Sequence, residues 1–172
     1  MDFFGVNLEA LLISSGYLAI FLIVFAESGL FFGFFLPGDS LLFTVGLLAS
    51  QGYFELPTLL LGIWVAAVLG DQVGYWTGSK FGRGLFNKPK SIFFNPSHVQ
   101  RAEEFYKKHG AKTIVLCRFV PVVRTFAPIV AGIAKMDYKI FLIYNILGGA
   151  LWTIVLVSGG FLVGSAIPDA GK

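Results

Sequence analysis

Charged side chains are scarce in this sequence. Lys, Arg, Asp and Glu make up 13% of its 172 residues and hydrophobic residues make up 56%, whereas a soluble domain carries about 25% charged residues. Residues 140–168 contain no charged side chain at all, and about 20 apolar residues are enough to cross the hydrocarbon core of a bilayer. The scarcity of charge therefore excludes an ordinary soluble domain and indicates a membrane protein.

Basic residues, cysteine and histidine are also rare or confined. No Lys or Arg precedes Lys80, so the N-terminus lacks the basic region of a cleavable signal peptide. The single cysteine, Cys117, excludes a disulfide within the chain. The two histidines, His98 and His109, match no metal-binding motif, so we expect neither a metal nor another cofactor.

Apolar stretches predict a single membrane domain of α-helices with three spans. The spans are about residues 10–35, 56–79 and 140–167. The first two each contain one charged side chain, Glu27 and Asp71 respectively, and the third contains none. Each stretch is longer than the roughly 20 residues that a spanning helix needs.

Two shorter apolar segments carry breaks in the backbone. Residues 36–50 are too short to cross the bilayer, and this length is typical of re-entrant or interfacial structure. Residues 113–134 are longer but are interrupted by prolines, which remove helical hydrogen bonds and kink the chain. The predicted breaks are Pro37, Gly38, Pro121 and Pro128. We predict that both segments dip into the bilayer and return to the same face.

The distribution of Lys and Arg predicts the orientation of these segments. Eight of the 13 basic residues fall within residues 80–112, and none falls in the loop near residues 50–57. Since short loops rich in Lys and Arg stay in the cytoplasm, the basic loop is expected inside and the other loop outside. Residues 36–50 then enter from outside, and residues 113–134, with basic residues on both flanks, enter from the cytoplasm. This orientation requires the first span to leave the cytoplasm and the second to return to it.

Opposed broken segments, each followed by a span, are typical of an inverted repeat. In transporters built this way, the interrupted segments line a site near the middle of the bilayer. A further spacing signal comes from four glycines that recur every four residues. They are Gly70, Gly74, Gly78 and Gly82. Small residues at this spacing predict close contact with a neighbouring helix.

Five charged side chains fall inside the predicted membrane segments: Glu27, Asp39, Asp71, Arg118 and Arg124. An Asp or Arg at the centre of a bilayer costs about 2.5–3.5 kcal/mol on insertion scales, so we expect each to be paired or to face a polar cavity. In an unbroken helix the two arginines, six residues apart, would point about 120° away from each other. A kink at Pro121 instead lets both guanidinium groups converge on one cavity.

Two interpretations of these charges stay open. In the first, the arginines pair with Glu27, Asp39 or Asp71 and only neutralise the interior. In the second, the two arginines bind an anion, most simply a phosphate, because a guanidinium can hold phosphate oxygens bidentately. Glu27 and Asp39 would then pair with the arginines or carry protons, since burial raises the pKa of a carboxyl group. Accessory candidates are Asp71 and Asn145.

Four motifs resemble the DedA family, whose members share the VTT, or SNARE-associated, domain. The motifs are FLPGDSLL at 35–42, GDQVGYWTGSKFG at 70–82, RFVPVVRTFAPIVAG at 118–132 and NILGGALW at 145–152. The resemblance covers roughly residues 20–165 and implies two opposed re-entrant hairpins. It further implies that the functional acids match Glu27 and Asp39, and that the essential arginines match Arg118 and Arg124. Family members usually carry a further C-terminal span, which is expected to be absent here.

The resemblance implies transport across the bacterial inner membrane, including return of undecaprenyl phosphate to the cytoplasmic leaflet. Our leading hypothesis is a flippase that moves a polyprenyl phosphate or a related phospholipid between leaflets, with coupling to protons open. Its isoprenoid tail would lie along a groove floored by Phe and Leu. One alternative is a proton-coupled transporter of a small solute or cation, and a second is a membrane-organising protein without transport.

Other partners and activities are less well supported by the residues. The expected partners are membrane lipids and protons, and association into a homo-oligomer stays open. No nucleic-acid recognition motif accompanies the basic loop. An enzyme is the weakest class, because a membrane lipid phosphatase usually needs a nucleophilic histidine near the bound phosphate. Both histidines instead fall in the basic loop, away from the arginine pair.

Overall fold

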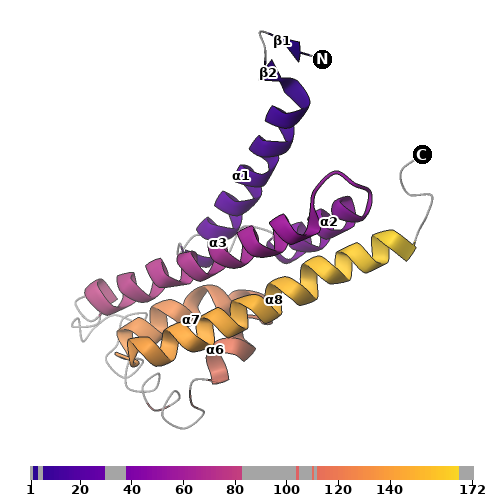
Figure 1. The fold of residues 1–172 in the computed structure, drawn as a ribbon. Helices are drawn as coiled ribbons and strands as arrows, with labels where there is room; N and C mark the ends of the chain where they lie inside the picture. Colours follow the sequence, from indigo (N-terminus) through magenta and orange to yellow (C-terminus); the bar gives the residue numbers. More distant parts are fainter. Residues whose placement is uncertain are drawn as a thin grey trace.

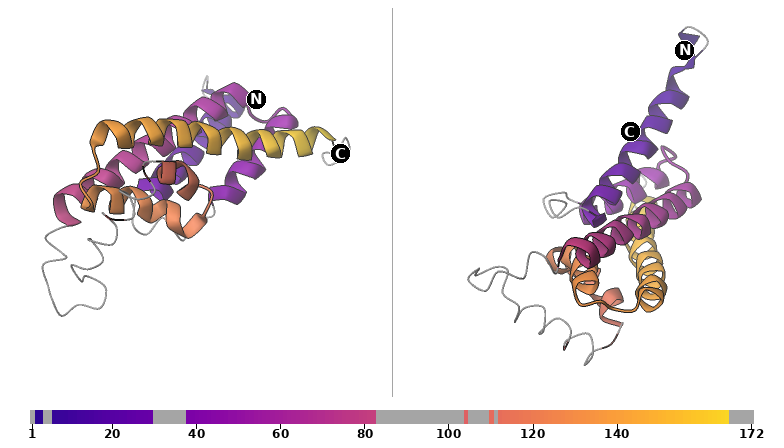
Figure 2. Two further views of the ribbon diagram at one scale, coloured as in Figure 1. Left: turned by 90° about the horizontal axis from the view of Figure 1, so that it is seen from below. Right: turned by 90° about the vertical axis from the view of Figure 1, so that its left-hand side faces the viewer.

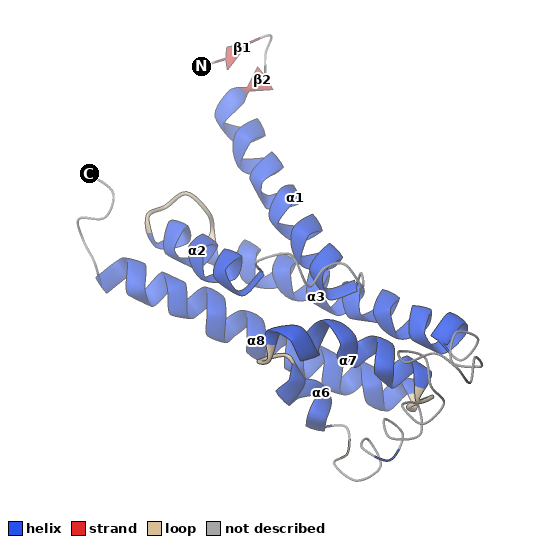
Figure 3. Ribbon diagram, turned by 180° about the vertical axis from the view of Figure 1, so that it is seen from behind, coloured by secondary structure: helices blue, strands red, loops and turns tan. Residues whose placement is uncertain are grey.

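Helices make up almost all of the described chain (Figures 1 and 3). The structure is a computed structural model, and it describes residues 2–3, 6–29, 38–82, 104, 110 and 112–166. The helices are α1 (Leu8–Gly29), α2 (Gly38–Ser50), α3 (Leu56–Thr77), the π-helix η2 (Gly78–Gly82), α6 (Lys112–Cys117), α7 (Pro121–Ile133) and α8 (Tyr138–Ala166). Two short strands, β1 (Asp2–Phe3) and β2 (Val6–Asn7), pair antiparallel before α1.

Two of these helices are long and apolar enough to cross a membrane. One comprises α3 and most of η2, over Leu56–Phe81, and the other is α8. Each holds at least the roughly 20 residues that a crossing requires. The predicted all-α class is therefore confirmed, with two helices that are long and apolar enough to cross a membrane.

The first helix runs in the same direction as α3, which differs from the predicted orientation. Gly16 of α1 lies beside Phe54, just before α3, and Gly29 packs directly against Gly70 in the middle of α3. In Figure 1, the N-terminal end of α1 stands away from the bundle, and the C-terminal end of α1 meets α3. The prediction of opposite directions for these two segments is wrong. Close contact between two glycines places the end of α1 halfway along α3 rather than at its far end.

The second helix runs from the middle of the bundle back along α8. A Cβ atom on Gly46 would lie 2.1 Å from the carbonyl oxygen of Val157, and one on Gly160 would lie 2.0 Å from that of Phe43. Glycine therefore allows the two backbones to touch, as small residues do between membrane helices. This contact holds α2 beside the second half of α8, as the left view of Figure 2 shows.

The α6–α7 segment is a helical hairpin with its turn in the middle of the bundle. The chain leaves the α-helical conformation at residues 118–120, and α7 restarts with Pro121 as a first-turn residue. Proline suits that position, where its missing N–H would have had no helical partner. The predicted break at Pro121 thus coincides with the turn. Pro128, however, does not break the chain: it lies inside α7, contrary to the prediction. Its ring packs against Gly74, where the absence of a side chain leaves room.

Three of the four evenly spaced glycines make the predicted close helix contacts. Gly70 meets α1, while Gly74 and Gly78 meet α7. A Cβ atom on Gly78 would lie 2.1 Å from the carbonyl oxygen of Ile129. From the other side, a Cβ atom on Gly132 would lie 2.1 Å from the carbonyl oxygen of Tyr75. These contacts fix α7 against α3 and so position the residues at the start of α7.

The hydrophobic core lies among α1, α2, α3 and α8. Its fully buried members include Val24, Leu42, Leu59, Ile63 and Val157. Many other large apolar side chains are exposed on α3 and α8, among them Leu69, Leu147 and Ile154. A soluble monomer rarely exposes apolar surface on this scale, whereas a membrane helix presents such side chains to lipid.

One end of the bundle carries all four described lysines. Lys80 lies in η2, directly after α3, with its ammonium group 4.6 Å from the ring centre of Trp76. Lys112 begins α6, and Lys135 and Lys139 flank the start of α8. The Tyr75 hydroxyl ties α3 to this end by donating to the carbonyl oxygen of Met136 at 2.5 Å. Most of the predicted basic loop 80–112, both histidines and Pro37 lie outside the described residues.

Candidate functional site

Arg118 occupies the turn between α6 and α7 and is buried. Its Nη2 donates to the Oδ2 atom of Asp71 on α3 and to the Oδ1 atom of Asn145 on α8. The Asn145 amide in turn donates to the carbonyl oxygen of Val68 at 3.2 Å. The two accessory candidates from the sequence are therefore the direct partners of this arginine.

The side chain of Arg118 lies flat against α8. Gly148 and Gly149 form this surface: a Cβ atom on Gly148 would lie 3.2 Å from Arg118 Cδ, and one on Gly149 would lie 3.6 Å from Arg118 Cζ. Larger residues would push the guanidinium away from its partners. The GG pair in NILGGALW thus makes room for a buried arginine.

Arg124 lies in the first turn of α7 and pairs with two other acids. Its Nη1 donates to Asp39 Oδ1, at the start of α2, and its Nη2 donates to Glu27 Oε1, near the end of α1. The start of α7 therefore meets α1 and α2, which are distant from it in the sequence, at one guanidinium group. An Arg fork can make such a two-point contact because its N–H groups have a fixed geometry.

Gly38 is required beside this ion pair. A Cβ atom at this position would lie 1.5 Å from Glu27 Oε2, so any side chain would displace the carboxylate. The sequence identified Gly38 as a backbone break, and it does begin α2. Its contact with Glu27 also shows that the start of α2 lies directly on the acid of α1.

Trp152 completes the site and was not predicted. Its Nε1 donates to Asp39 Oδ1 at 3.0 Å, and its ring centre lies 4.7 Å from the Cζ atom of Arg124. A cation this close to an indole face is attracted to the ring. Residues four and seven apart share a helix face, so the spacing of Asn145, Gly149 and Trp152 in the fourth motif could have revealed the role of Trp152.

The charged cluster lies halfway along the two long helices. Trp152 is the fifteenth of the 29 residues of α8, which places it about 21 Å from either end at about 1.5 Å per residue. Asp71 is the sixteenth of the 26 residues of the α3 span. Unpaired charges at such a depth would each cost several kcal/mol, and pairing reduces that cost.

The arginines do not share one set of acids. Arg118 pairs with Asp71, and Arg124 pairs with Glu27 and Asp39. The structure therefore shows the ion pairing expected under the first interpretation of the charges. It brings together all five charged side chains identified in the sequence, in two adjoining groups.

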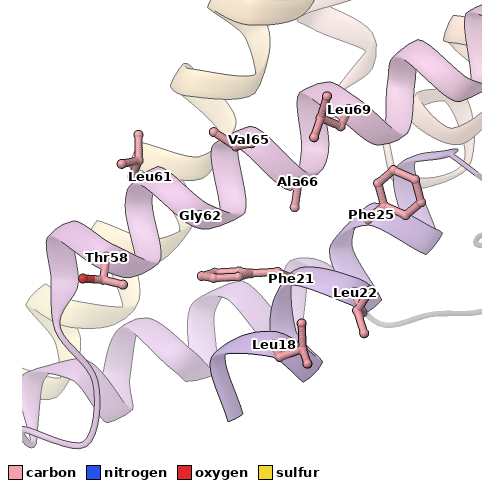
Figure 4. Close-up of a pocket in the computed structure, with 10 residues that line it drawn as sticks. All are labelled: Leu18, Phe21, Leu22, Phe25, Thr58, Leu61, Gly62, Val65, Ala66 and Leu69. Carbon is pink, nitrogen blue, oxygen red and sulfur yellow. The ribbon is translucent and has the colours of Figure 1, made fainter. Parts of the chain in front are cut away.

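An apolar groove lies between α1 and α3 on the outside of the bundle (Figure 4). Its volume is about 550 Å³ and its lining is almost entirely hydrocarbon. Phe21 lies against Gly62 at its floor, and Leu22 and Val65 form part of its walls. The groove ends at Phe25 and Leu69, each two residues before an acid of the cluster, Glu27 or Asp71.

Comparison with known proteins places this arrangement in a family. Residues 36–162, which contain all of the charged cluster except Glu27, match the VTT domain. The chain is also 46% identical to Protein DedA of Escherichia coli over 151 residues, which is 87% of this chain and 69% of that protein. The chain belongs to the DedA family.

Other relatives agree with this DedA-family assignment. An uncharacterized membrane protein of Mycobacterium leprae is 44% identical over 86% of this chain and 66% of its own length. The inner membrane protein YqjA of Escherichia coli is 37% identical over 86% of this chain and 67% of its own length. The chain thus spans about two thirds of these relatives, and the names place the family in bacterial membranes. No solved structure matches the chain.

Proposed function

We propose that this DedA-family chain is a flippase that moves an anionic lipid between the leaflets of the bacterial inner membrane. The substrate class is a polyprenyl phosphate such as undecaprenyl phosphate, or a related phospholipid, and no covalent chemistry is involved. The observation that carries the proposal is a pair of arginines at the middle of the bundle, each held by carboxylates. Guanidinium groups bind phosphate as well as carboxylate, so a phosphate can take the place of an acid.

The proposed membrane arrangement has two opposed re-entrant hairpins related as an inverted repeat. One is α6–α7, whose turn at residues 118–120 holds Arg118. The other comprises α1 and α2, because α1 ends at Gly29 beside the middle of α3 and α2 leaves from the same level. The sequence predicted instead that residues 36–50 alone enter the bilayer from outside, without α1. The lysines at one end of the bundle are proposed to face the cytoplasm, following the rule for basic loops.

The chemical problem for such a flippase is the passage of a phosphate through hydrocarbon. An ionised group at mid-bilayer is costly unless it is paired. A positive partner at that depth lowers the barrier, and Arg118 and Arg124 lie there. The groove between α1 and α3 would hold the isoprenoid tail, since it is apolar and ends level with the acids.

Proton coupling is a second feature of the proposal. Three carboxylates face two guanidinium groups in the cluster, so acid is in excess by one group. Binding of an anion would increase the negative charge further, so a carboxyl group would take up a proton at the same time. The same excess of acid favours a second candidate function, a proton-coupled transporter of a small solute or cation.

Removal of either arginine is expected to slow lipid translocation. Arg124→Ala should slow phosphate-lipid exchange between leaflets by about 30-fold or more, because loss of one desolvated charge contact costs about 2 kcal/mol or more. Arg118→Ala should slow it as well, because it leaves the buried Asp71 without its partner. The measurement is a leaflet assay on purified protein in vesicles, with Lys139→Ala at the exposed end as the control. Variants that fold and move the lipid as fast as the parent would rule out this mechanism. If lipid exchange is absent while neutral variants of the acids abolish solute uptake, the second candidate is correct.

Filling the groove is expected to slow a long-chain lipid more than a short-chain one. Val65→Trp adds bulk to a groove wall that is 44% exposed, and should reduce translocation of a polyprenyl phosphate by about fivefold, corresponding to about 1 kcal/mol. The matched control is Ile154→Trp on the exposed face of α8. The leaflet assay is run with a long-chain and with a short-chain lipid phosphate. An equal effect of the two variants would exclude the groove as the path of the tail.

A further inference from the structure

The two arginine sites differ in how accessible their ion pairs are. The side chains of Arg118 and Asp71 are 6% and 5% exposed, so this pair is sealed on both sides. The side chain of Arg124 is 9% exposed, but that of its partner Asp39 is 36% exposed. An incoming anion can therefore reach the position of Asp39 without unpacking the core, whereas it would have to separate helices to reach Asp71.

The two sites also differ in what would happen to the acid if an anion displaced it from its arginine. Among the described residues, the Asp71 side chain accepts from Arg118 alone, and the nearby Asn145 already donates to Val68. Displacing Asp71 would leave a buried carboxylate without a partner, which is among the most unfavourable states in a protein interior. The Arg118 site therefore favours a permanent ion pair.

At the second site, Asp39 has a partner besides the arginine. Its Oδ1 atom accepts from Arg124 Nη1 and also from Trp152 Nε1, at 3.0 Å. If an anion replaces Asp39 at the guanidinium, the indole N–H still holds the carboxylate. The Trp152 ring meanwhile keeps its stacking position 4.7 Å from Arg124 Cζ, which preserves the orientation of the fork.

We infer that Arg124 is the arginine that receives the anion, and that Trp152 is a positioning residue that holds Asp39 during the exchange. Arg118, Asp71 and Asn145 form a structural strut that fixes the α6–α7 turn against α3 and α8. The ligand carries a terminal phosphate group, either as the monoester headgroup of a lipid or as free inorganic phosphate. This inference rests on the proposed function and divides its two arginines into one binding and one structural group.

Conservative variants of the full chain in lipid nanodiscs test this division. The measurement is the rise in unfolding temperature caused by dihexanoyl phosphatidic acid or by inorganic phosphate, titrated to give a dissociation constant. Arg124→Lys should weaken binding about tenfold, because Lys keeps the charge but loses the two-point fork. Arg118→Lys should lower the unfolding temperature without ligand and change the dissociation constant less than about twofold.

The role of Trp152 has its own matched pair of variants. Trp152→Phe keeps an aromatic ring and removes the N–H donor, and should weaken binding about fivefold, because Asp39 loses its second partner. Trp64→Phe also removes an indole N–H, which donates to the carbonyl oxygen of Ile146 at 3.0 Å outside the site. It should leave the dissociation constant unchanged. Equal effects of the two tryptophan variants would overturn the positioning role.

The outcomes separate this inference from the proposed function. If neither ligand stabilises the parent, the proposed function fails, and the inference fails with it. If a ligand binds and Arg118→Lys weakens it as much as Arg124→Lys does, the inference alone is overturned. Tighter binding of the lipid phosphate than of inorganic phosphate identifies a headgroup, and equal binding identifies a free anion. Both results support Arg124 as the site, provided that Arg124→Lys weakens binding more than Arg118→Lys does.

Discussion

Asp71→Ala is expected to destabilise the protein by about 3–5 kcal/mol, because it leaves the buried Arg118 without its carboxylate. The side chains of both partners are almost fully buried, so solvent cannot replace the lost partner. The measurement is thermal unfolding in detergent micelles, monitored by the loss of the helical circular dichroism signal. The same change at the exposed Asp137, which accepts from two backbone N–H groups at the start of α8, should cost only about 1 kcal/mol.

A double variant distinguishes loss of pairing from loss of packing. Asp71→Leu combined with Arg118→Leu removes both charges, and replacing a buried ion pair by apolar residues is often neutral or stabilising. This variant should recover at least about 2 kcal/mol of the loss caused by Asp71→Ala. A double variant as unstable as the single one would show that the strut acts by shape and not by charge compensation.

Gly160→Ala is expected to separate α2 from α8. The new methyl group would lie 2.0 Å from the carbonyl oxygen of Phe43, which is backbone and cannot rotate away. Overpacking of this kind costs about 1–3 kcal/mol or more. Because α2 carries Asp39 and α8 carries Trp152, the shift should also weaken their hydrogen bond and reduce translocation. The measurements are thermal unfolding and the leaflet assay on the same preparation.

The adjacent glycine provides the matched control for this prediction. A Cβ atom on Gly159 would meet only the Phe43 ring, at 3.9 Å, which is ordinary van der Waals contact. Gly159→Ala should therefore be neutral or slightly stabilising, since it reduces the conformational entropy of the unfolded chain. Similar losses from both substitutions would mean that the contact of Gly160 with α2 does not decide stability here.

These predictions share one structural cause, which is the meeting of α1, α2, α3, α7 and α8 at half depth. Arg118 lies in the turn 118–120 and Arg124 lies in the first turn of α7, and each reaches acids on other helices. The glycines of α3 and α8 bring the backbones close enough for these contacts. Stability and the proposed transport are therefore coupled through the same cluster.

Much of the site followed from the sequence because charge is rare in an apolar chain. Glu27, Asp39, Asp71, Arg118 and Arg124 stood out for this reason alone, and the structure gathers all of them. The sequence did not reveal which of these acids pairs with which arginine. Pairing depends on which turns of distant helices lie level with one another, and a single sequence does not contain that register.

Trp152 shows why an aromatic residue of the site was missed. In a chain with 16% aromatic residues, a tryptophan in a spanning helix carries no signal of its own. Its function depends on an N–H group aimed at Asp39 and a ring face aimed at Arg124. Both directions depend on the packing of α8 against α2 and on the position of Arg124 in the first turn of α7.

Proline had opposite consequences at two places in one segment. Pro121 begins α7 after the turn, whereas Pro128 is accommodated inside the helix. The residue type is the same, so the sequence predicted a break at both. Gly74 of α3 supplies the space for the Pro128 ring, and that neighbour is known only from the folded chain.

The sequence by itself determined that the chain lives in a membrane, that it is helical, and which charges lie inside it. Length and hydrophobicity decide these properties, because the bilayer sets the thickness and excludes unpaired charge. Only the tertiary structure decided that α1 runs parallel to α3, that Arg118 and Arg124 have separate acids, and that Trp152 joins the site. The reason is physical: these features depend on close contacts between backbones at glycines, and such contacts fix the level and rotation of each helix.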